Sequence, residues 1–206
     1  DNIADIVLLG EKEKIRRETE KKELYYLQQE SIVDIHDDEF MELHMNLINE
    51  AKRIKNISQV QAEELLKNPL NVGALMVKSG YVDGMVAGAT FHSRDVIMSA
   101  LQFVGLSEDI VFSYNIMVSP NEEIGENGAI VLADCAINQS PDEVELADIA
   151  IRTAKEFNRI FYSEPKTAFM SCSTYGSSEG KEIEKIRRAI KLARDQEPEM
   201  IFDGEF

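Results

Sequence analysis

The sequence predicts an α/β fold with mostly parallel sheets and helices on both faces. Short apolar runs alternate along the chain with longer segments in which apolar residues recur every three or four positions. The short runs are typical of strands buried on both faces, and the longer segments are typical of helices with one buried face. Such alternation favours parallel strands that are joined by helical crossovers.

Local signals place the elements of the first half of the chain. The expected strands are residues 6–10, 31–35 and 85–87. The expected helices are residues 11–28, 40–51, a segment opening at 58–61, residues 70–79 and a segment from Arg94. Ser58 and Gln61 fit a capping box at a helix start. Gly80 suits the position that follows a helix end.

The second half continues the alternation. The expected strands are residues 111–118, 129–133, 167–170 and 200–202, and the expected helices run from Ser140 to about Arg159 and over 183–193. Ser140 is the predicted N-cap, with Pro141 at the first helical position. Because no Pro-, Gly- or Ser-rich linker separates the halves, we place a boundary at Ser119-Pro120. This gives a first α/β domain over 1–118 and a second over 119–206.

The composition excludes several classes of protein. The 206 residues include 22 Lys or Arg and 38 Asp or Glu, a formal net charge of −16, and 44% are hydrophobic. The apolar fraction is too high for a disordered chain, and no apolar run approaches the ~20 residues that a membrane span requires. Coating a nucleic acid requires clustered basic residues, whereas this chain is acidic, so we expect no nucleic-acid partner. Because no apolar run is long enough, we also expect no membrane partner.

The cysteines and the start of the chain bear on its compartment. Cys135 and Cys172 lie in apolar runs and are too few for a disulfide framework. The first residues show neither the basic leader nor the apolar segment of a secretory signal. We therefore expect buried, reduced thiols in a cytoplasmic protein.

Two loops are candidates for a ligand site, because ligands of parallel sheets bind beyond the carboxyl ends of strands. In residues 83–93, Gly88 permits close backbone approach, Ser93 can cap the following helix, and His92 is the only histidine in a plausible site loop. Exposed helix N–H groups at that end attract anions. The alternative interpretation is an ordinary strand–turn–helix connection with a capping serine.

The second candidate loop is rich in hydroxyl groups. Residues 171–181 contain four Ser, one Thr and two Gly between a predicted strand and a predicted helix. Their hydroxyl and backbone N–H groups suit phosphate, although the spacing is not that of a Walker A loop. We predict that residues 171–178 bind an anion at the N-terminus of the helix that begins near Gly180. A capped loop without a ligand is the alternative.

Other groupings of reactive side chains are interpreted as structural. The acidic and His side chains of residues 36–44 lie at a helix start, where acids stabilise the helix dipole, so no metal is predicted there. Cys135 has no base near it in the sequence and is interpreted as a structural thiol rather than a nucleophile.

Six segments resemble phosphate acetyltransferase. They are Ala4 to Gly10, Asp83 to Ala89, Ser99 to Gln102, Leu132 to Asn138, Ser171 to Ser177 and Ile201 to Gly204. They follow the family's order and cover nearly the whole chain. The related phosphate butyryltransferases share the fold but are less similar in these motifs.

The resemblance implies an acyltransferase that moves acetyl between coenzyme A and inorganic phosphate, giving acetyl phosphate. Coenzyme A is then a substrate, and neither a cofactor nor a metal is expected. The implied architecture has two α/β domains, as in isocitrate and isopropylmalate dehydrogenases, with the site in the cleft between them, and the implied assembly is a homodimer. In the implied mechanism the CoA thiolate, helped by a carboxylate base, attacks the acetyl carbonyl of acetyl phosphate, and phosphate leaves. Cationic or N–H donors stabilise the developing oxyanion and the leaving phosphate.

The two loops, the resemblance and the position of Arg94 together give the predicted substrate-binding residues. They are Gly88, His92, Ser93, Arg94, Ser171, Ser173, Thr174, Gly176, Ser177 and Ser178. Where the family usually reads Ser-Thr-Ala-Asp-Thr-Val-Arg, this chain keeps Asp95 but has Met98 in place of the arginine. Arg94 lies four residues before Met98, on the same helix face. We hypothesise that Arg94 supplies the guanidinium from one turn away.

Family members continue past the end of this chain, and their catalytic Ser-Arg pair and Asp lie in that tail. We therefore expect a fragment that lacks the family's N-terminal start and has its catalytic residues beyond Phe206, so that the chain alone is inactive. Two alternatives stay open: a phosphate butyryltransferase-like acyltransferase, and a non-catalytic CoA-binding or regulatory domain of the same fold.

Overall fold

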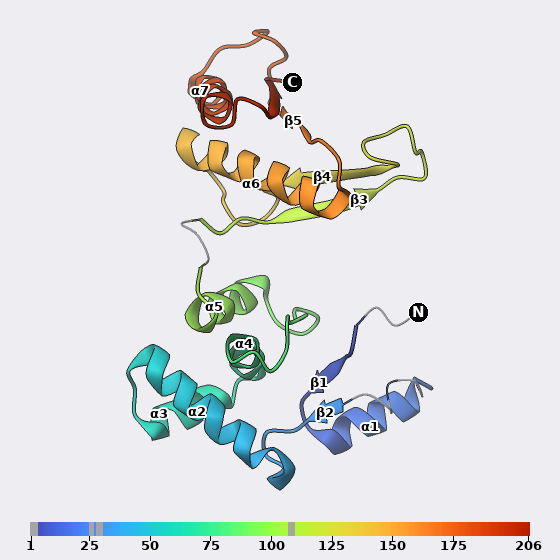
Figure 1. The fold of residues 1–206 in the computed structure, drawn as a ribbon, viewed down its shortest axis with the longest axis vertical. Coiled ribbons are helices and arrows are strands. Elements are labelled where there is room, and N and C mark those ends of the chain that lie inside the picture. The colour runs from blue at the N-terminus through green and yellow to red at the C-terminus, as the bar shows by residue number, and fades with distance from the viewer. Residues whose placement is uncertain (1–3, 25–26, 28–30, 107–109) are drawn as a thin grey trace. The chain divides into compact units, whose positions relative to one another are not determined.

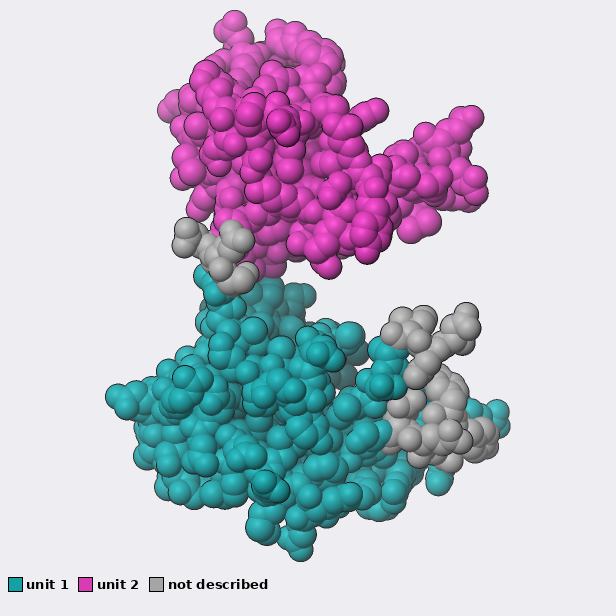
Figure 2. Space-filling view, in the orientation of Figure 1, with its two compact units in different colours: residues 1–107 teal, residues 108–206 magenta. Residues whose placement is uncertain are grey.

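The computed structural model describes residues 4–24, 27, 31–106 and 110–206. The chain forms two compact units, residues 1–107 and 108–206, which Figure 2 shows in separate colours. The sequence analysis placed the boundary after residue 118, which would separate two strands, 114–118 and 129–133, that pair with each other. This pairing puts both strands in the second unit.

The first unit contains two short strands and most of the helices (Figure 1). Its elements are β1 (Val7–Leu9), α1 (Lys12–Lys21), β2 (Ser31–Val33), the short 3-10 helix η2 (Asp38–Phe40), α2 (Met41–Lys55), α3 (Gln59–Leu66), α4 (Pro69–Lys78) and α5 (Ser93–Phe103). β1 and β2 are parallel, with Leu8 opposite Ile32. The helix predicted over 11–28 is shorter than expected and ends at Lys21, and residues 25, 26 and 28 lie outside the described residues.

Helix ends in this unit follow the sequence signals. Ser58 and Gln61 form the predicted capping box, with the Ser58 N–H donating to Gln61 Oε1 at 3.0 Å. α4 has Asn68 as its N-cap, whose Oδ1 accepts from the Leu70 N–H at 3.0 Å. Gly80 follows α4 with a φ of +72°, a left-handed conformation that glycine adopts without steric cost.

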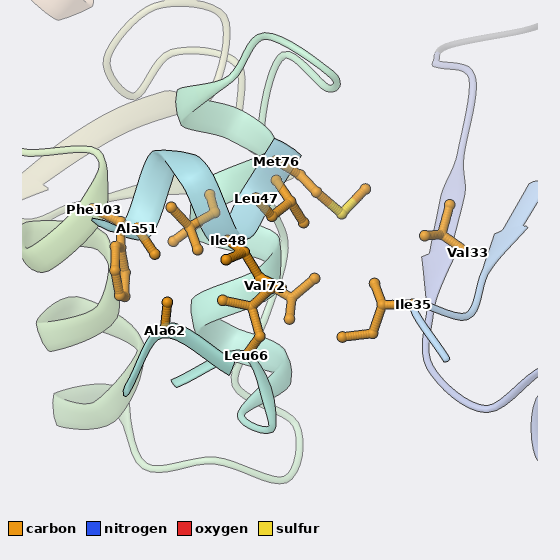
Figure 3. Packing of buried hydrophobic residues seen from close by; sticks show 12 residues of the cluster. Val33, Ile35, Leu47, Ile48, Ala51, Ala62, Leu66, Val72, Met76 and Phe103 are labelled. Carbon is orange, nitrogen blue, oxygen red and sulfur yellow. The ribbon is translucent and has the colours of Figure 1, made fainter. Parts of the chain in front are cut away.

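The core of the first unit is built around α4, whose residues from Leu70 to Met76 are all buried. Figure 3 shows the cluster extending from Phe103 of α5, across α2 and α4, to Val33 and Ile35 at β2. α4 also holds α5 through a buried polar contact, in which the Ser99 hydroxyl donates to Asn71 Oδ1 at 3.0 Å. The middle of α5 is thereby attached to the most buried helix of the unit.

The second unit contains an antiparallel ribbon and a small α/β layer (Figure 1). Its elements are β3 (Tyr114–Val118), β4 (Ala129–Ala133), α6 (Glu143–Phe161), β5 (Lys166–Phe169), α7 (Lys181–Gln196) and β6 (Ile201–Gly204). α6 contacts α7, β4 and β5. Small buried residues of both helices, including Ala150 and Ala189, pack with the rings of Phe169 and Phe202. The alanines let the two helices approach closely, and the two neighbouring strands supply the large apolar side chains.

The α/β class is confirmed, but the prediction of mostly parallel sheets with helices on both faces is only partly met. The described residues form three two-stranded sheets, of which β1–β2 and β5–β6 are parallel and β3–β4 is antiparallel. The strand predicted at 85–87 does not form, since Val86 is fully exposed and its backbone pairs with no described strand. A three-residue apolar run forms a strand only when it can pair with a neighbouring strand.

The start of α6 differs from the prediction by two residues. Its N-cap is Asp142 rather than Ser140, and the carboxylate accepts from the N–H groups of Val144 and Glu145, both at 2.9 Å. Glu145 in turn accepts from the Asp142 N–H at 2.9 Å. The capping box thus satisfies two of the N–H groups that a helix start leaves without a partner, together with the N–H of the cap itself. In the parts of the chain that the structure describes, no helix has the length and apolar character to cross a membrane.

Candidate functional site

The hydroxyl-rich loop of the second unit lies where two parallel strands end. Phe169 of β5 is opposite Gly204 of β6, so the chain leaves both strands at the same edge. The Ser171 N–H donates to the Phe206 carbonyl at 2.7 Å, and the Phe206 N–H donates to the Phe169 carbonyl at 3.0 Å. This register brings the loop over the two residues that follow β6.

Glu205, the first of those residues, is the centre of the loop's hydrogen bonding. Its carboxylate accepts from the Ser173 hydroxyl and from the Gly176 N–H, the latter at 3.1 Å. Arg187 of α7 donates to it twice, from Nε to Oε2 at 2.8 Å and from Nη2 to Oε1 at 2.9 Å. Glu205 is only 2% exposed. The hydrogen bonds from Arg187 and Ser173 are the main reason that the pKa of Glu205 falls to about 2.

The loop backbone is turned toward this carboxylate. Tyr175 and Gly176 have φ values of +44° and +82°, so two consecutive N–H groups point to Glu205. The Tyr175 N–H donates to the Glu205 backbone carbonyl at 3.0 Å, and the Gly176 N–H reaches the carboxylate. Only the Gly176 N–H donates to an anionic group, since the Tyr175 N–H donates to a neutral carbonyl. In this structure the anion is a side chain of the chain itself.

Further hydrogen bonds close the loop on itself. Ser171 Oγ accepts from the Ser173 N–H at 2.8 Å, and Ser177 Oγ accepts from the Thr174 N–H at 2.9 Å. The Ser178 N–H donates to Ser173 Oγ at 3.1 Å. The structure thus brings together the predicted residues of this loop. Ser173 and the Gly176 N–H, however, are already bonded to Glu205, while the hydroxyls of Thr174 and Ser178 have no hydrogen-bond partner among the described residues.

A shallow open cavity of about 530 Å³ lies beside the loop. It is lined by Tyr175, Gly176, Glu179, Arg187, Gly204 and Glu205. Arg187 faces it with part of its guanidinium and also donates from Nη1 to Glu184 at 2.7 Å. The Tyr175 ring packs edge-on against the Phe206 ring, with the ring centroids 5.0 Å apart.

The other predicted residues lie in the first unit, before and within α5. Gly88 has a φ of +125°, and the segment around it is exposed. Ser93 is the first residue of α5 and not its cap: the N-cap is His92, whose side chain makes no capping hydrogen bond. Arg94 and Met98 are both exposed on α5, whereas Ser99 is buried. Arg94 and Met98 therefore lie on the same solvent-exposed face of α5, as predicted.

A second carboxylate that the sequence analysis did not single out as functional is Asp134, directly after β4. It accepts from the backbone N–H and hydroxyl of Ser113 and from the N–H and Nδ2 of Asn138, and also from Ala136 and Ile137. Burial alone would raise the pKa of Asp134, but these hydrogen bonds outweigh burial and lower it strongly. Asp134 thus fixes the turn over residues 134–138 against the residues that precede β3.

The prediction of buried cysteines is wrong. Cys135 and Cys172 are both free and exposed, because each lies just beyond a strand end, outside the apolar run that precedes it. Glu205 and Arg187 were missed by the sequence analysis. The signal for Glu205 was its place three residues after the strand expected at 200–202, in a fold that predicts strands parallel to the one that ends before the loop. Among the described residues, no group of three His, Cys, Asp or Glu side chains is arranged to hold a metal ion.

Comparison with known proteins gives a consistent result. The family model described as phosphate acetyl/butaryl transferase matches residues 1–206. The chain is 36% identical to a phosphate acetyltransferase of Thermoanaerobacterium thermosaccharolyticum, over 100% of this chain and 62% of that protein. It is 35% identical to a phosphate acetyltransferase of Acetivibrio thermocellus, over 98% and 61%. The chain therefore spans about three-fifths of the length of these relatives.

Solved structures agree with the sequence comparison. The EutD phosphotransacetylase from Staphylococcus aureus superimposes with a TM-score of 0.78 and 29% identity, covering 97% of this chain and 60% of that structure. A phosphotransacetylase from Streptococcus pyogenes superimposes with a TM-score of 0.77 and 31% identity, covering 96% and 59%.

Proposed function

Since the chain belongs to the phosphate acetyl/butaryl transferase family, we propose that its protein transfers acetyl between coenzyme A and inorganic phosphate. The observation that carries the proposal is the match over all 206 residues, together with relatives at 35% and 36% identity that are named phosphate acetyltransferase. The substrates are then acetyl-CoA and phosphate in one direction, and acetyl phosphate and CoA in the other. This chemistry needs neither a metal nor a further cofactor.

The chain's own residues suit the phosphate side of such a reaction. The exposed hydroxyl of Thr174 and that of Ser178 are available on a loop whose shape is fixed by internal hydrogen bonds. Arg94 offers a guanidinium at the start of α5, where helix N–H groups also favour an anion. Holding phosphate in this way orients it for transfer and reduces the entropy cost of the reaction.

The proposal includes the setting of the enzyme. We place it in the cytoplasm, in acetate metabolism, as a homodimer with the two-domain architecture of isocitrate and isopropylmalate dehydrogenases. No nucleic acid and no membrane takes part. Static light scattering of the full-length protein tests the dimer, and a crystal structure of it tests the architecture.

The activity is tested by thiol release in the full-length protein. We expect CoA to be released from acetyl-CoA only when phosphate is present, with acetyl phosphate as the second product. Omission of phosphate is the control. CoA binding without any phosphate-dependent release would contradict the proposal and favour a non-catalytic CoA-binding domain.

A second candidate is transfer of a longer acyl group, because the matching family model covers both acetyl and butyryl transferases. The same assay with butyryl-CoA separates the two. We expect a higher kcat/KM for acetyl-CoA, in line with the names of the relatives. A higher value for butyryl-CoA would assign the protein to the second activity.

A further inference from the structure

We infer that Glu205 is a positioning residue, which fixes the loop over residues 171–178 and thereby the hydroxyls that the proposed function assigns to phosphate. That the loop binds phosphate rests on the proposed function. That Glu205 holds the loop does not depend on it. Glu205 itself touches no substrate in this scheme, since its carboxylate is turned into the protein.

Arg187 and the loop hold the carboxylate of Glu205, and the strand pairing holds its backbone. Arg187 approaches from α7 with two parallel hydrogen bonds at 2.8 and 2.9 Å, the geometry in which a guanidinium binds a carboxylate most firmly. The loop contributes the Ser173 hydroxyl and the Gly176 N–H. The β6 backbone beside it is held through Phe206, whose N–H donates to the Phe169 carbonyl.

The loop's shape depends on this carboxylate more than on any other described group. Ser173 is fully buried, and its hydroxyl both donates to Glu205 and accepts from the Ser178 N–H. Without the carboxylate, the buried Ser173 Oγ would lose its acceptor inside the protein, which costs more than losing a bond in water, and the Gly176 N–H would lose the acceptor that holds it to the protein. Residues 174–178 lie between these anchors, so the hydroxyls of Thr174 and Ser178 are fixed through them.

The geometry argues against a model in which Glu205 occupies an anion site of the loop and is displaced from it by an external anion. A phosphate at the same donors would have to break both bonds to Arg187 and leave a nearly buried carboxylate without its partners. External phosphate therefore meets the hydroxyls of Thr174 and Ser178, not the groups that hold Glu205.

The first test is hydrogen exchange in Glu205→Gln. Glutamine keeps the size of the side chain but has one acceptor oxygen and no charge, so it cannot satisfy both Arg187 donors together with Ser173 and Gly176. We expect faster exchange of the Gly176 and Ser178 amides, at least tenfold, and unchanged exchange of the paired β5–β6 amides. The matched control is Glu143→Gln, which removes another Glu–Arg pair of α7, at Arg188. Unchanged Gly176 and Ser178 exchange in Glu205→Gln would overturn the inference.

The second test is steady-state kinetics of the same variants in the full-length protein. A loosened loop should raise the KM for phosphate about tenfold in Glu205→Gln with little change in kcat, and Arg187→Lys should lie between it and the wild type. A loss of correctly folded protein alone would lower kcat at constant KM, and that result would overturn the inference. A lower KM for phosphate would also overturn it, since Glu205 would then occupy the anion site. If the wild type shows no phosphate-dependent release, the proposed function fails, while the exchange experiment still decides the role of Glu205.

Discussion

Gly204 lies so close to Phe169 that a Cβ at this position would be 2.7 Å from the Phe169 carbonyl oxygen and 3.2 Å from Ile190 Cδ1. Its φ is +147°, a conformation that side chains rarely adopt. The close approach is what allows β6 to pair with β5 beneath α7. Glu205 therefore reaches the loop only because the residue before it has no side chain.

We predict that Gly204→Ala destabilises the second unit by about 2–4 kcal/mol, since it adds overpacking against a backbone atom to the cost of the φ value. The matched control is Gly180→Ala, because Gly180 has a φ of +149° but open space around its Cβ position. Urea unfolding of the chain measures both. Equal losses in the two variants would show that conformation alone, and not the contact with Phe169, sets the cost.

The lowered pKa of Glu205 predicts an acid-sensitive loop. Its pKa falls from an ordinary value of 4.5 to about 2, so its stabilising contribution is complete above pH 4.5 and is lost as the pH falls toward 2. We expect the exchange of the Gly176 amide, corrected for its intrinsic pH dependence, to increase over this range in the wild type. In Glu205→Gln it should already be fast and independent of pH. A flat profile in the wild type would contradict the assignment.

Asp134 gives a prediction for the turn that follows β4. Asp134→Ala should lower the free energy of unfolding by about 1–3 kcal/mol, because it removes the acceptor of several N–H groups at once. The control is Asp195→Ala, which removes an exposed ion pair with Lys191 and should cost under about 1 kcal/mol. Urea unfolding followed by circular dichroism compares them. Similar losses in both variants would mean that the turn is held by other contacts.

The parts of the fold that sequence analysis predicted correctly depend on neighbours in the chain. The capping box at Ser58 and the glycine after α4 involve residues within one helical turn, so their spacing alone defines them. The strand at 85–87 was predicted wrongly because a strand depends on a distant partner that its own residues do not specify. The cap of α6 was misplaced because Ser140 and Asp142 are both good N-caps, each with a glutamate three residues later, so the local pattern does not choose between them.

Sequence analysis predicted only the part of the site that residues close together in the chain define. Composition located the hydroxyl-rich loop, and the structure assembles its predicted residues in one place. Composition could not show that the buried acceptor at the centre of the loop is Glu205, which lies 32 residues from Ser173 in the sequence. That contact follows from the pairing of β5 with β6, a long-range feature that no local pattern encodes.

The exposed cysteines give a prediction that opposes the sequence-based one. Both thiols should react with a neutral disulfide reagent in the folded chain without denaturant, because Cys135 and Cys172 are exposed and free. The control is the same reaction in urea, which should raise the rate but not the number of thiols. Reaction of neither thiol before unfolding would show that both are covered.

The last prediction concerns Arg94 and its neighbour one turn along α5. If Arg94 contacts phosphate, Arg94→Ala in the full-length protein should raise the KM for phosphate about tenfold, since a charge-assisted hydrogen bond contributes roughly 1.5–3 kcal/mol and each 1.4 kcal/mol is a factor of ten. Arg53→Ala is the control, because Arg53 is an exposed arginine of the same unit whose one ion-pair partner among the described residues is Glu50.

A second variant tests whether phosphate binding requires a guanidinium on this face of α5 rather than at position 94 itself. Met98 is 44% exposed and lies four residues after Arg94 on α5, so Arg94→Ala combined with Met98→Arg places the guanidinium one turn further along the same face. We expect the double variant to recover most of the phosphate affinity, because the long arginine side chain can span one helical turn. Recovery would identify this face of α5 as a phosphate contact. An unchanged KM in Arg94→Ala would show that Arg94 does not replace the family's arginine, and that the phosphate depends on groups elsewhere in the protein.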